Sequence, residues 1–169
     1  MHGDFAENYR LLEPGAELPT CDARIAQLYG YWLSIRPPPE LLPARHDMSP
    51  TDIPRLLPWL WLADVHRGRR FRYRLVGTVH VDAFGSNTAG HWYDEAHPHF
   101  QRSTAYPQFV AVAERGKVAF YRGPPAFLIH APWKIIERLI LPLARNGRDV
   151  DMLLGITVLD PRPVSPGGP

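Results

Sequence analysis

The first strong pattern along the chain is a helical spacing of apolar residues between positions 20 and 36. Residues three and four positions apart lie on the same side of a helix, so this spacing predicts an amphipathic helix. The run Pro37-Pro38-Pro39 would end it. The apolar side of this predicted helix is formed by Ile25, Leu28, Tyr29, Trp32 and Ile35.

Two segments in the first half of the chain have the pattern of strands. Residues 59–65 are apolar and aromatic, and residues 71–78 alternate large apolar side chains with arginines. In the second segment Phe71, Tyr73 and Leu75 share one side, which should face the core. The short link at 66–70 contains a central glycine, so we expect the two strands to form an antiparallel hairpin.

Short helices and further strands complete the pattern. Cap residues at 49–52 predict a short helix to about Leu57, and 79–96 combines turn signals with short helical pieces. A longer helix is expected over 100–115, with Gly116 ending it. Strands are then predicted at 117–121, 133–143 and 150–159, the last two joined by a hairpin at Asn146-Gly147. Strands separated by a block of helices favour an α+β fold with an antiparallel sheet.

The predicted strand at 133–143 is apolar on both sides. One side carries Trp133, Ile135, Leu139, Leu141 and Leu143, and the other side is also partly apolar. A sheet of this kind must be covered on both faces, and the middle helices can cover only one. The helix at 20–36 would cover the other face, either within the monomer or across a dimer. We keep both alternatives, and in the second the helix side defined above is the interface.

Composition narrows the class of protein. With 169 residues the chain fits one domain, which we divide into a polar segment 1–19, the helix and a Pro-rich linker 20–48, the folded domain 49–160, and a tail 161–169 expected to be disordered. No apolar run is long enough to span a membrane and no signal peptide is recognisable, so we expect a cytoplasmic protein. A net charge of +2 gives no support for nucleic-acid binding, and a single cysteine excludes an internal disulfide.

Several short motifs together resemble a known family. They are Asp52-Ile53-Pro54, Leu57-Pro58-Trp59, the strand 71–78, Phe84-Gly85, Thr88-Ala89-Gly90, the segment 137–143, Asn146-Gly147 and the segment 150–155. Over about 23–159 the chain resembles single-domain PAS proteins of bacteria, common in alphaproteobacteria. The resemblance implies a five-stranded antiparallel sheet with helices on one face and a small cavity between them. It also implies a stand-alone signalling or regulatory protein.

A small-molecule pocket is one candidate site. Such pockets combine apolar walls with a few polar groups, and tyrosine and tryptophan supply both. We assign the candidate ligand-binding residues as Tyr73, Leu75, Phe84, Trp92, Tyr93, Phe109, Val112 and Ile140.

Other chemistry has weaker support. Haem is an alternative cofactor, because His91, His97 and His99 lie near apolar residues that could line a haem slot. The common metal motifs and the nucleophile and phosphate-loop motifs are missing from the sequence. We therefore expect no enzyme, no metal site, no nucleic acid and no membrane partner. The expected function is a non-catalytic signalling domain that contacts a protein partner or a second copy, with a small ligand as a modulator; the alternative is a cofactor-binding sensor.

Overall fold

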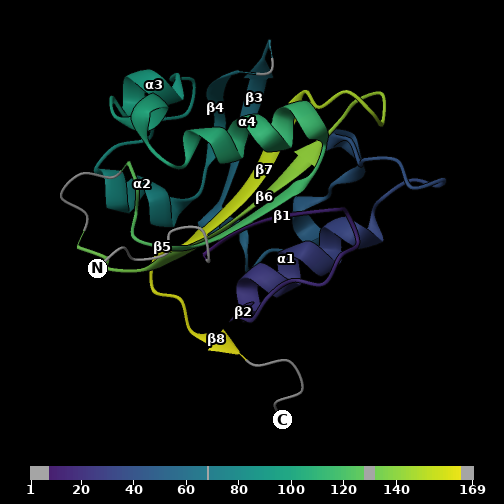
Figure 1. Cartoon of the computed structure of the whole chain (residues 1–169), viewed down its shortest axis with the longest axis horizontal. Helices are drawn as coiled ribbons and strands as arrows, with labels where there is room; N and C mark the ends of the chain where they lie inside the picture. The colour runs from purple at the N-terminus through teal and green to yellow at the C-terminus, as the bar shows by residue number, and fades with distance from the viewer. Residues whose placement is uncertain (1–7, 68, 128–131, 165–169) are drawn as a thin grey trace.

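The computed structural model describes residues 8–67, 69–127 and 132–164. Its centre is a six-stranded antiparallel sheet (Figure 1). In spatial order the strands are β1 (Tyr9–Leu12), β5 (Val118–Gly123), β6 (Ile136–Leu143), β7 (Met152–Val158), β3 (Leu60–His66) and β4 (Arg70–Val76). A second, two-stranded sheet pairs β2 (Cys21–Asp22) with β8 (Pro163–Val164). The prediction of an antiparallel α+β fold is confirmed.

The sheet has one strand more than the five predicted. The additional strand, β1, lies in the segment 1–19 that we expected to be only polar, and it pairs with the free edge of β5. Its four residues, Tyr-Arg-Leu-Leu, are too few to show a period-2 pattern. β1 therefore forms because its backbone pairs with the free edge of β5. Such pairing is not visible in the pattern of apolar and polar residues. Of the predicted tail, 163–164 form β8, and 165–169 lie outside the described residues.

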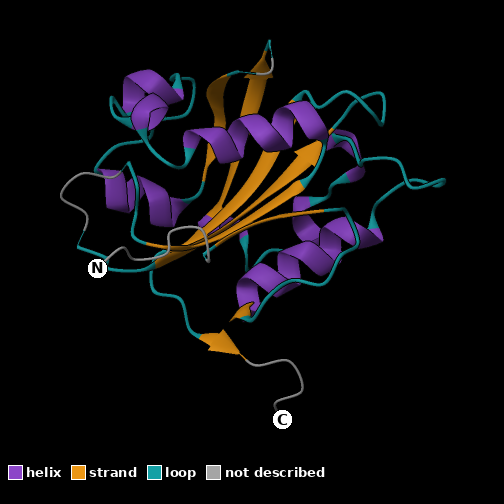
Figure 2. Ribbon diagram, viewed as in Figure 1, coloured by secondary structure: helices purple, strands orange, loops and turns teal. Residues whose placement is uncertain are grey.

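Helices lie on both faces of the sheet, as Figure 2 shows by colour. One face carries α1 (Ala23–Ser34), and the other carries α2 (Thr78–Phe84), α3 (Tyr93–Ala96) and α4 (Tyr106–Arg115). Asp22 caps α1 by accepting a hydrogen bond from the Arg24 amide at 2.9 Å. Gly116 ends α4 at φ 64°, as predicted, because glycine adopts this left-handed conformation without steric cost.

Four single 3-10 turns connect these elements. They are η1 (Arg45–Asp47), η2 (Pro50–Asp52), η3 (Leu57–Trp59) and η4 (Phe100–Arg102). The helix predicted over 49–57 is therefore two separate turns, and the one predicted over 100–115 divides into η4 and α4, with Pro107 in the first turn of α4. Proline fits the first helical turn because its missing N–H has no partner there.

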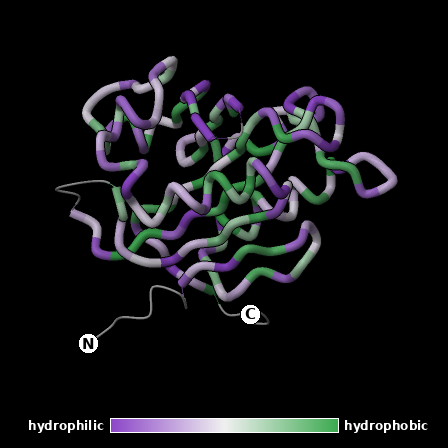
Figure 3. The backbone as a smooth tube through the Cα atoms, turned by 45° about the horizontal axis from the view of Figure 1, so that its top comes forward, coloured by the Kyte–Doolittle hydropathy of each residue, from purple (hydrophilic) through white to green (hydrophobic). Residues whose placement is uncertain are grey.

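The face under α1 is a core of mainly aliphatic residues. Ile25, Leu28 and Trp32 are 0% exposed and pack against the alternating leucines and isoleucines of β6 and β7. The Trp32 indole Nε1 also donates a hydrogen bond to the Pro142 carbonyl at 3.1 Å. In Figure 3 many of the hydrophobic stretches of the backbone lie toward the middle of the molecule.

This packing corrects the dimer alternative for α1. The five residues assigned to an interface face the sheet of their own chain, with Tyr29 buried and Ile35 partly buried against the same core. Side chains already covered within the monomer cannot supply the surface of a dimer in this conformation. The cover that the sheet requires is thus provided in cis.

Candidate functional site

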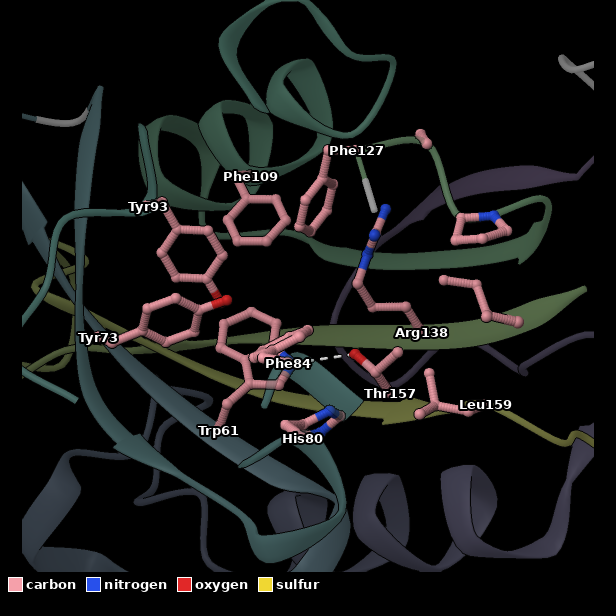
Figure 4. Close-up of a pocket in the computed structure, with 13 residues that line it drawn as sticks. Trp61, Tyr73, His80, Phe84, Tyr93, Phe109, Phe127, Arg138, Thr157 and Leu159 are labelled. Atoms are coloured by element: carbon pink, nitrogen blue, oxygen red, sulfur yellow. Dashed lines mark hydrogen bonds between the residues drawn. The ribbon is translucent and has the colours of Figure 1, made fainter. Parts of the chain in front are cut away.

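The opposite face of the sheet forms a pocket together with α2, α3, α4 and the loop after β5. About 450 Å³ of space lies between its walls, part of it open to solvent, but only about 30 Å³ is open to the centre of a water molecule. The space between the walls is therefore narrow. Figure 4 shows the lining residues, which are Trp61, Tyr73, His80, Phe84, Tyr93, Phe109, Pro125, Ala126, Phe127, Ile136, Arg138, Thr157 and Leu159.

Trp61 lies flat across the sheet at the base of this pocket. Its register partner on β7 is Gly155, and a Cβ atom built at position 155 would fall 1.9 Å from the indole. Only glycine therefore leaves room for the ring. The indole Nε1 donates a hydrogen bond to Thr157 Oγ1 at 3.0 Å, and the ring stacks on Phe109 with centroids 5.3 Å apart.

Two buried tyrosines form the side wall. The rings of Tyr73 and Tyr93 stack with centroids 3.8 Å apart, and the Tyr73 hydroxyl shares a 2.7 Å hydrogen bond with His97 Nε2. Burial raises the pKa of both tyrosines, so they remain neutral. Burial lowers the pKa of His97 to about 4, so the imidazole is uncharged at neutral pH.

Arg138 supplies a positive charge to the pocket. It lies on β6, is 2% exposed, and donates from Nη2 to Gln108 Oε1 at 2.8 Å. Its Nε is buried without a hydrogen-bond partner, and none of the described carboxylates lies within 4.0 Å of the guanidinium. Burial lowers the pKa of Arg138 to about 10, which still leaves it protonated at neutral pH. Figure 4 shows the guanidinium rising from β6 to the level of Phe127.

The neighbouring charge on β6 has a different environment. Glu137 faces the opposite side of the sheet, because successive side chains of a strand point to opposite faces. There it pairs with Arg122 and accepts a hydrogen bond from the Asp22 amide at 2.7 Å. The negative charge nearest to Arg138 in sequence is therefore already neutralised, on the other face.

His80 completes the polar lining. Its Nε2 donates a 2.7 Å hydrogen bond to the Trp59 carbonyl, since a carbonyl can only accept. Burial lowers the pKa of His80, so this side chain is also held neutral. Arg138 is thus the charged group among the lining residues that the structure describes.

Four of the eight predicted ligand-binding residues line the pocket: Tyr73, Phe84, Tyr93 and Phe109. Val112 and Ile140 are buried in the same aromatic cluster but behind the walls. Leu75 is 42% exposed, which corrects its assignment. A β-bulge at Arg74 shifts the pairing with β3 between Leu62 and Ala63, so Leu75 turns away from the side of Tyr73.

The assignment of Trp92 is also corrected. This residue bridges to Arg72 at the outer edge of β4, with the Arg70 guanidinium 3.9 Å from its ring centroid. Its ring also contacts His66 at 4.7 Å between centroids. The loop that carries Trp92 adds to the sheet edge rather than folding over the pocket, so the tryptophan packs against cations at the surface.

The sequence analysis missed residues that the fold adds from distant strands. Trp61, Thr157 and Arg138 belong to β3, β7 and β6, which become neighbours only in the sheet. A signal was present for Arg138, because it is a charge between Ile136 and Ile140 on one side of the predicted strand 133–143. Its companions His80 and Phe127 come from a short helix and a loop, which give no comparable pattern.

The haem alternative is not supported by the positions of its histidines. His91 and His99 are exposed, whereas His97 is buried and bound to Tyr73. The space open within the pocket is also far below what a porphyrin occupies. Across the described ranges, no group of three or more His, Cys, Asp and Glu side chains is arranged to hold a metal ion.

An antiparallel sheet with short helices on one face and a pocket between them defines the domain as a two-layer α+β domain on this side. The family model described as PAS domain matches residues 22–158, and the chain belongs to that family. PAS domains have signalling or sensory regulatory roles and are in general not catalytic. No curated protein and no solved structure matches the chain. None of its described helices has the length and apolar character needed to cross a membrane.

Proposed function

We propose that this protein is a non-catalytic sensor that binds a small molecule in the pocket above Trp61 and passes the change to a partner protein. The observation that carries the proposal is the aromatic pocket, which is built from both layers of the domain. Its walls include side chains of the sheet, of α2, α3 and α4, and of the loop after β5. A bound molecule would favour one spacing of these elements over another, which is the requirement for a switch.

The chemistry of the lining supports binding in preference to catalysis. The lining residues include no Asp, Glu, Cys, Ser or Lys in the described part of the chain. The two tyrosines are held protonated by burial, and the Thr157 hydroxyl oxygen accepts a hydrogen bond from the Trp61 indole. The Tyr73 hydroxyl does share a hydrogen bond with His97, but burial raises the pKa of this tyrosine, which disfavours the ionised form that a nucleophile needs.

Strand β4 offers a route for the signal. Tyr73 faces the pocket, while its neighbours Arg72 and Arg74 are exposed on the other side of the strand. These two arginines line a surface concavity with four guanidinium groups and two carboxylates, formed by Arg45, Arg72, Arg74, Arg145, Asp64 and Asp151. The excess of positive charge favours an acidic protein surface as the partner over a second copy of this chain.

A binding screen with a blocked pocket tests the proposal. Native mass spectrometry of freshly purified protein would detect a retained small molecule, and a thermal-shift screen of compounds below about 200 Da would detect added ones. We expect binding to the native protein and to the surface variant Thr51→Leu, and loss of binding in Thr157→Leu, which fills the pocket. If no compound binds, or if Thr157→Leu binds as the native protein does, the pocket is not a ligand site.

A further inference from the structure

The buried guanidinium of Arg138 is an unusual feature for a domain core. Burying a charge is costly unless it is paired and hydrogen-bonded, and arginine is almost never fully buried without such a partner. Arg138 has one neutral partner, Gln108, and an unpartnered Nε. The remaining surroundings are aromatic, with the guanidinium carbon 5.1 Å from the Tyr121 ring centroid and 5.6 Å from that of Phe109.

A matching anion would remove this imbalance. The planar guanidinium has several N–H donors in a fixed arrangement that fits the two oxygens of a carboxylate. One cation calls for one negative charge, which favours a carboxylate over a doubly charged phosphate. The other walls of the pocket are mainly rings, which favour a flat, apolar body.

From this arrangement we infer that the pocket binds a small aromatic or similarly flat monocarboxylate, with the carboxylate on Arg138 and the ring between the aromatic side chains above Trp61. This inference rests on the proposed function, since it specifies the ligand of the same pocket. It makes Arg138 a specificity-determining residue. A ligand without the negative charge would leave the guanidinium unpaired in a dry site, and its affinity would be correspondingly lower.

Matched pairs of acids and amides test the inference. Benzoate and phenylacetate are titrated calorimetrically into the full-length protein at pH 7, beside benzamide and phenylacetamide, which have nearly the same shape without the charge. We expect each acid to bind the native protein at least tenfold more tightly than its amide. Equal binding of acid and amide, or no binding of either acid, would overturn the inference.

Variants at position 138 test whether Arg138 causes the preference for the acid over the amide. Arg138→Met alone leaves Gln108 Oε1 without its donor, so the variant Arg138→Met/Gln108→Leu, in which both partners are apolar, guards against misfolding. We expect this double variant to lose the tenfold preference for the acid and to retain amide binding within about threefold. Arg138→Lys should keep part of the preference, because it keeps the charge without the planar fork. Arg55→Gln, which removes an exposed arginine that lines neither the pocket nor the surface concavity, is the matched control and should bind as the native protein does.

The outcomes separate the inference from the proposed function. A preference that persists in Arg138→Met/Gln108→Leu contradicts the assignment to Arg138. In another outcome the acids do not bind, but a neutral compound binds the native protein and not Thr157→Leu. This result would overturn the inference and would still support the pocket as a ligand site of a sensor. Failure of every compound in both assays removes the inference and the proposed function together.

Discussion

The two faces of the sheet are built from the same strands but are filled differently. On the α1 face, Leu139, Leu141 and Leu143 of β6 meet mainly aliphatic side chains, and the buried charge of Glu137 is paired with Arg122. On the other face the same strand contributes Ile136, Arg138 and Ile140 to a cluster dominated by aromatic rings. Flexible aliphatic side chains fill space efficiently, whereas flat rings over a glycine leave a slot. The first face therefore serves stability, and in the proposed function the second gives up some stability for a ligand site.

Replacing Trp32, a large buried side chain of the aliphatic face, should have the largest effect on stability. Trp32→Ala leaves a large cavity under α1 and removes the hydrogen bond to Pro142, so we expect a loss of about 3–5 kcal/mol in the free energy of unfolding. Chemical denaturation followed by circular dichroism would measure it. Gln27→Ala, at an exposed position of the same helix, should change stability little. A loss below about 1 kcal/mol for Trp32→Ala would contradict the packing of α1 on the sheet.

A decrease in pH should destabilise the aromatic face before it affects the ion pairs on the α1 face. The pKa of His97 is lowered by burial from 6.5 to about 4, so between these values the unfolded chain binds a proton that the folded chain does not. Stability is therefore complete above pH 6.5 and falls as the pH decreases towards 4, by on the order of 3 kcal/mol. Burial lowers the pKa of His80 in the same direction. The pKa of Asp22 is about 2, because hydrogen bonds from Arg24 and Arg162 outweigh the effect of burial, so its contribution is lost only below pH 3.8.

Thermal unfolding between pH 7 and 4 would test the role of His97. His97→Gln keeps a hydrogen-bonding partner for the Tyr73 hydroxyl but does not titrate, so its stability should depend less on pH than that of the native protein. The exposed His91→Gln should retain the native pH dependence. An unchanged pH profile in His97→Gln would assign the acid sensitivity to other groups.

Adding a side chain at Gly155, under the Trp61 ring, should have a smaller effect on stability. Gly155→Ala places a methyl group where the Trp61 indole lies, so the ring must move, at a cost of about 1–3 kcal/mol. Because Trp61 lines the pocket, binding of any pocket ligand should weaken as well. Tryptophan fluorescence and the thermal-shift screen would measure the two effects. Gly30→Ala, in α1 with open space around the added atom, is the control, and an equal response in both variants would argue against a close contact at 155.

Two residues that the sequence analysis assigned to the pocket, and that the structure places outside it, should have the smallest effect on ligand affinity and stability. Leu75→Thr and Trp92→Phe alter side chains at the sheet edge, so ligand affinity should remain within about twofold of the native value, and stability within about 0.5 kcal/mol. Calorimetric titration with benzoate provides the measurement. A loss of affinity in Trp92→Phe comparable to that in Thr157→Leu would bring this tryptophan back into the site.

Local patterns predicted the elements because each requires only nearby residues. The spacing from Ile25 to Ile35 indicated α1, and Gly116 correctly ended α4. Four of the thirteen lining residues followed in the same way, and two of them, Tyr73 and Phe109, occupy the apolar sides of a strand and a helix. The pattern failed at Leu75, because a bulge reverses the alternation of sides and leaves no mark in the apolar spacing.

By itself, the sequence determined the antiparallel α+β class, the apolar character of both sides of β6 and the family of the chain. Only the tertiary structure decided that α1 covers the sheet in its own chain, that β1 extends the sheet, and that Trp61, Gly155 and Arg138 meet in one pocket. The physical reason is the range of the interactions. Periodicity and turn preferences act over a few residues, whereas strand register and cover by a helix depend on pairing between segments far apart in the chain.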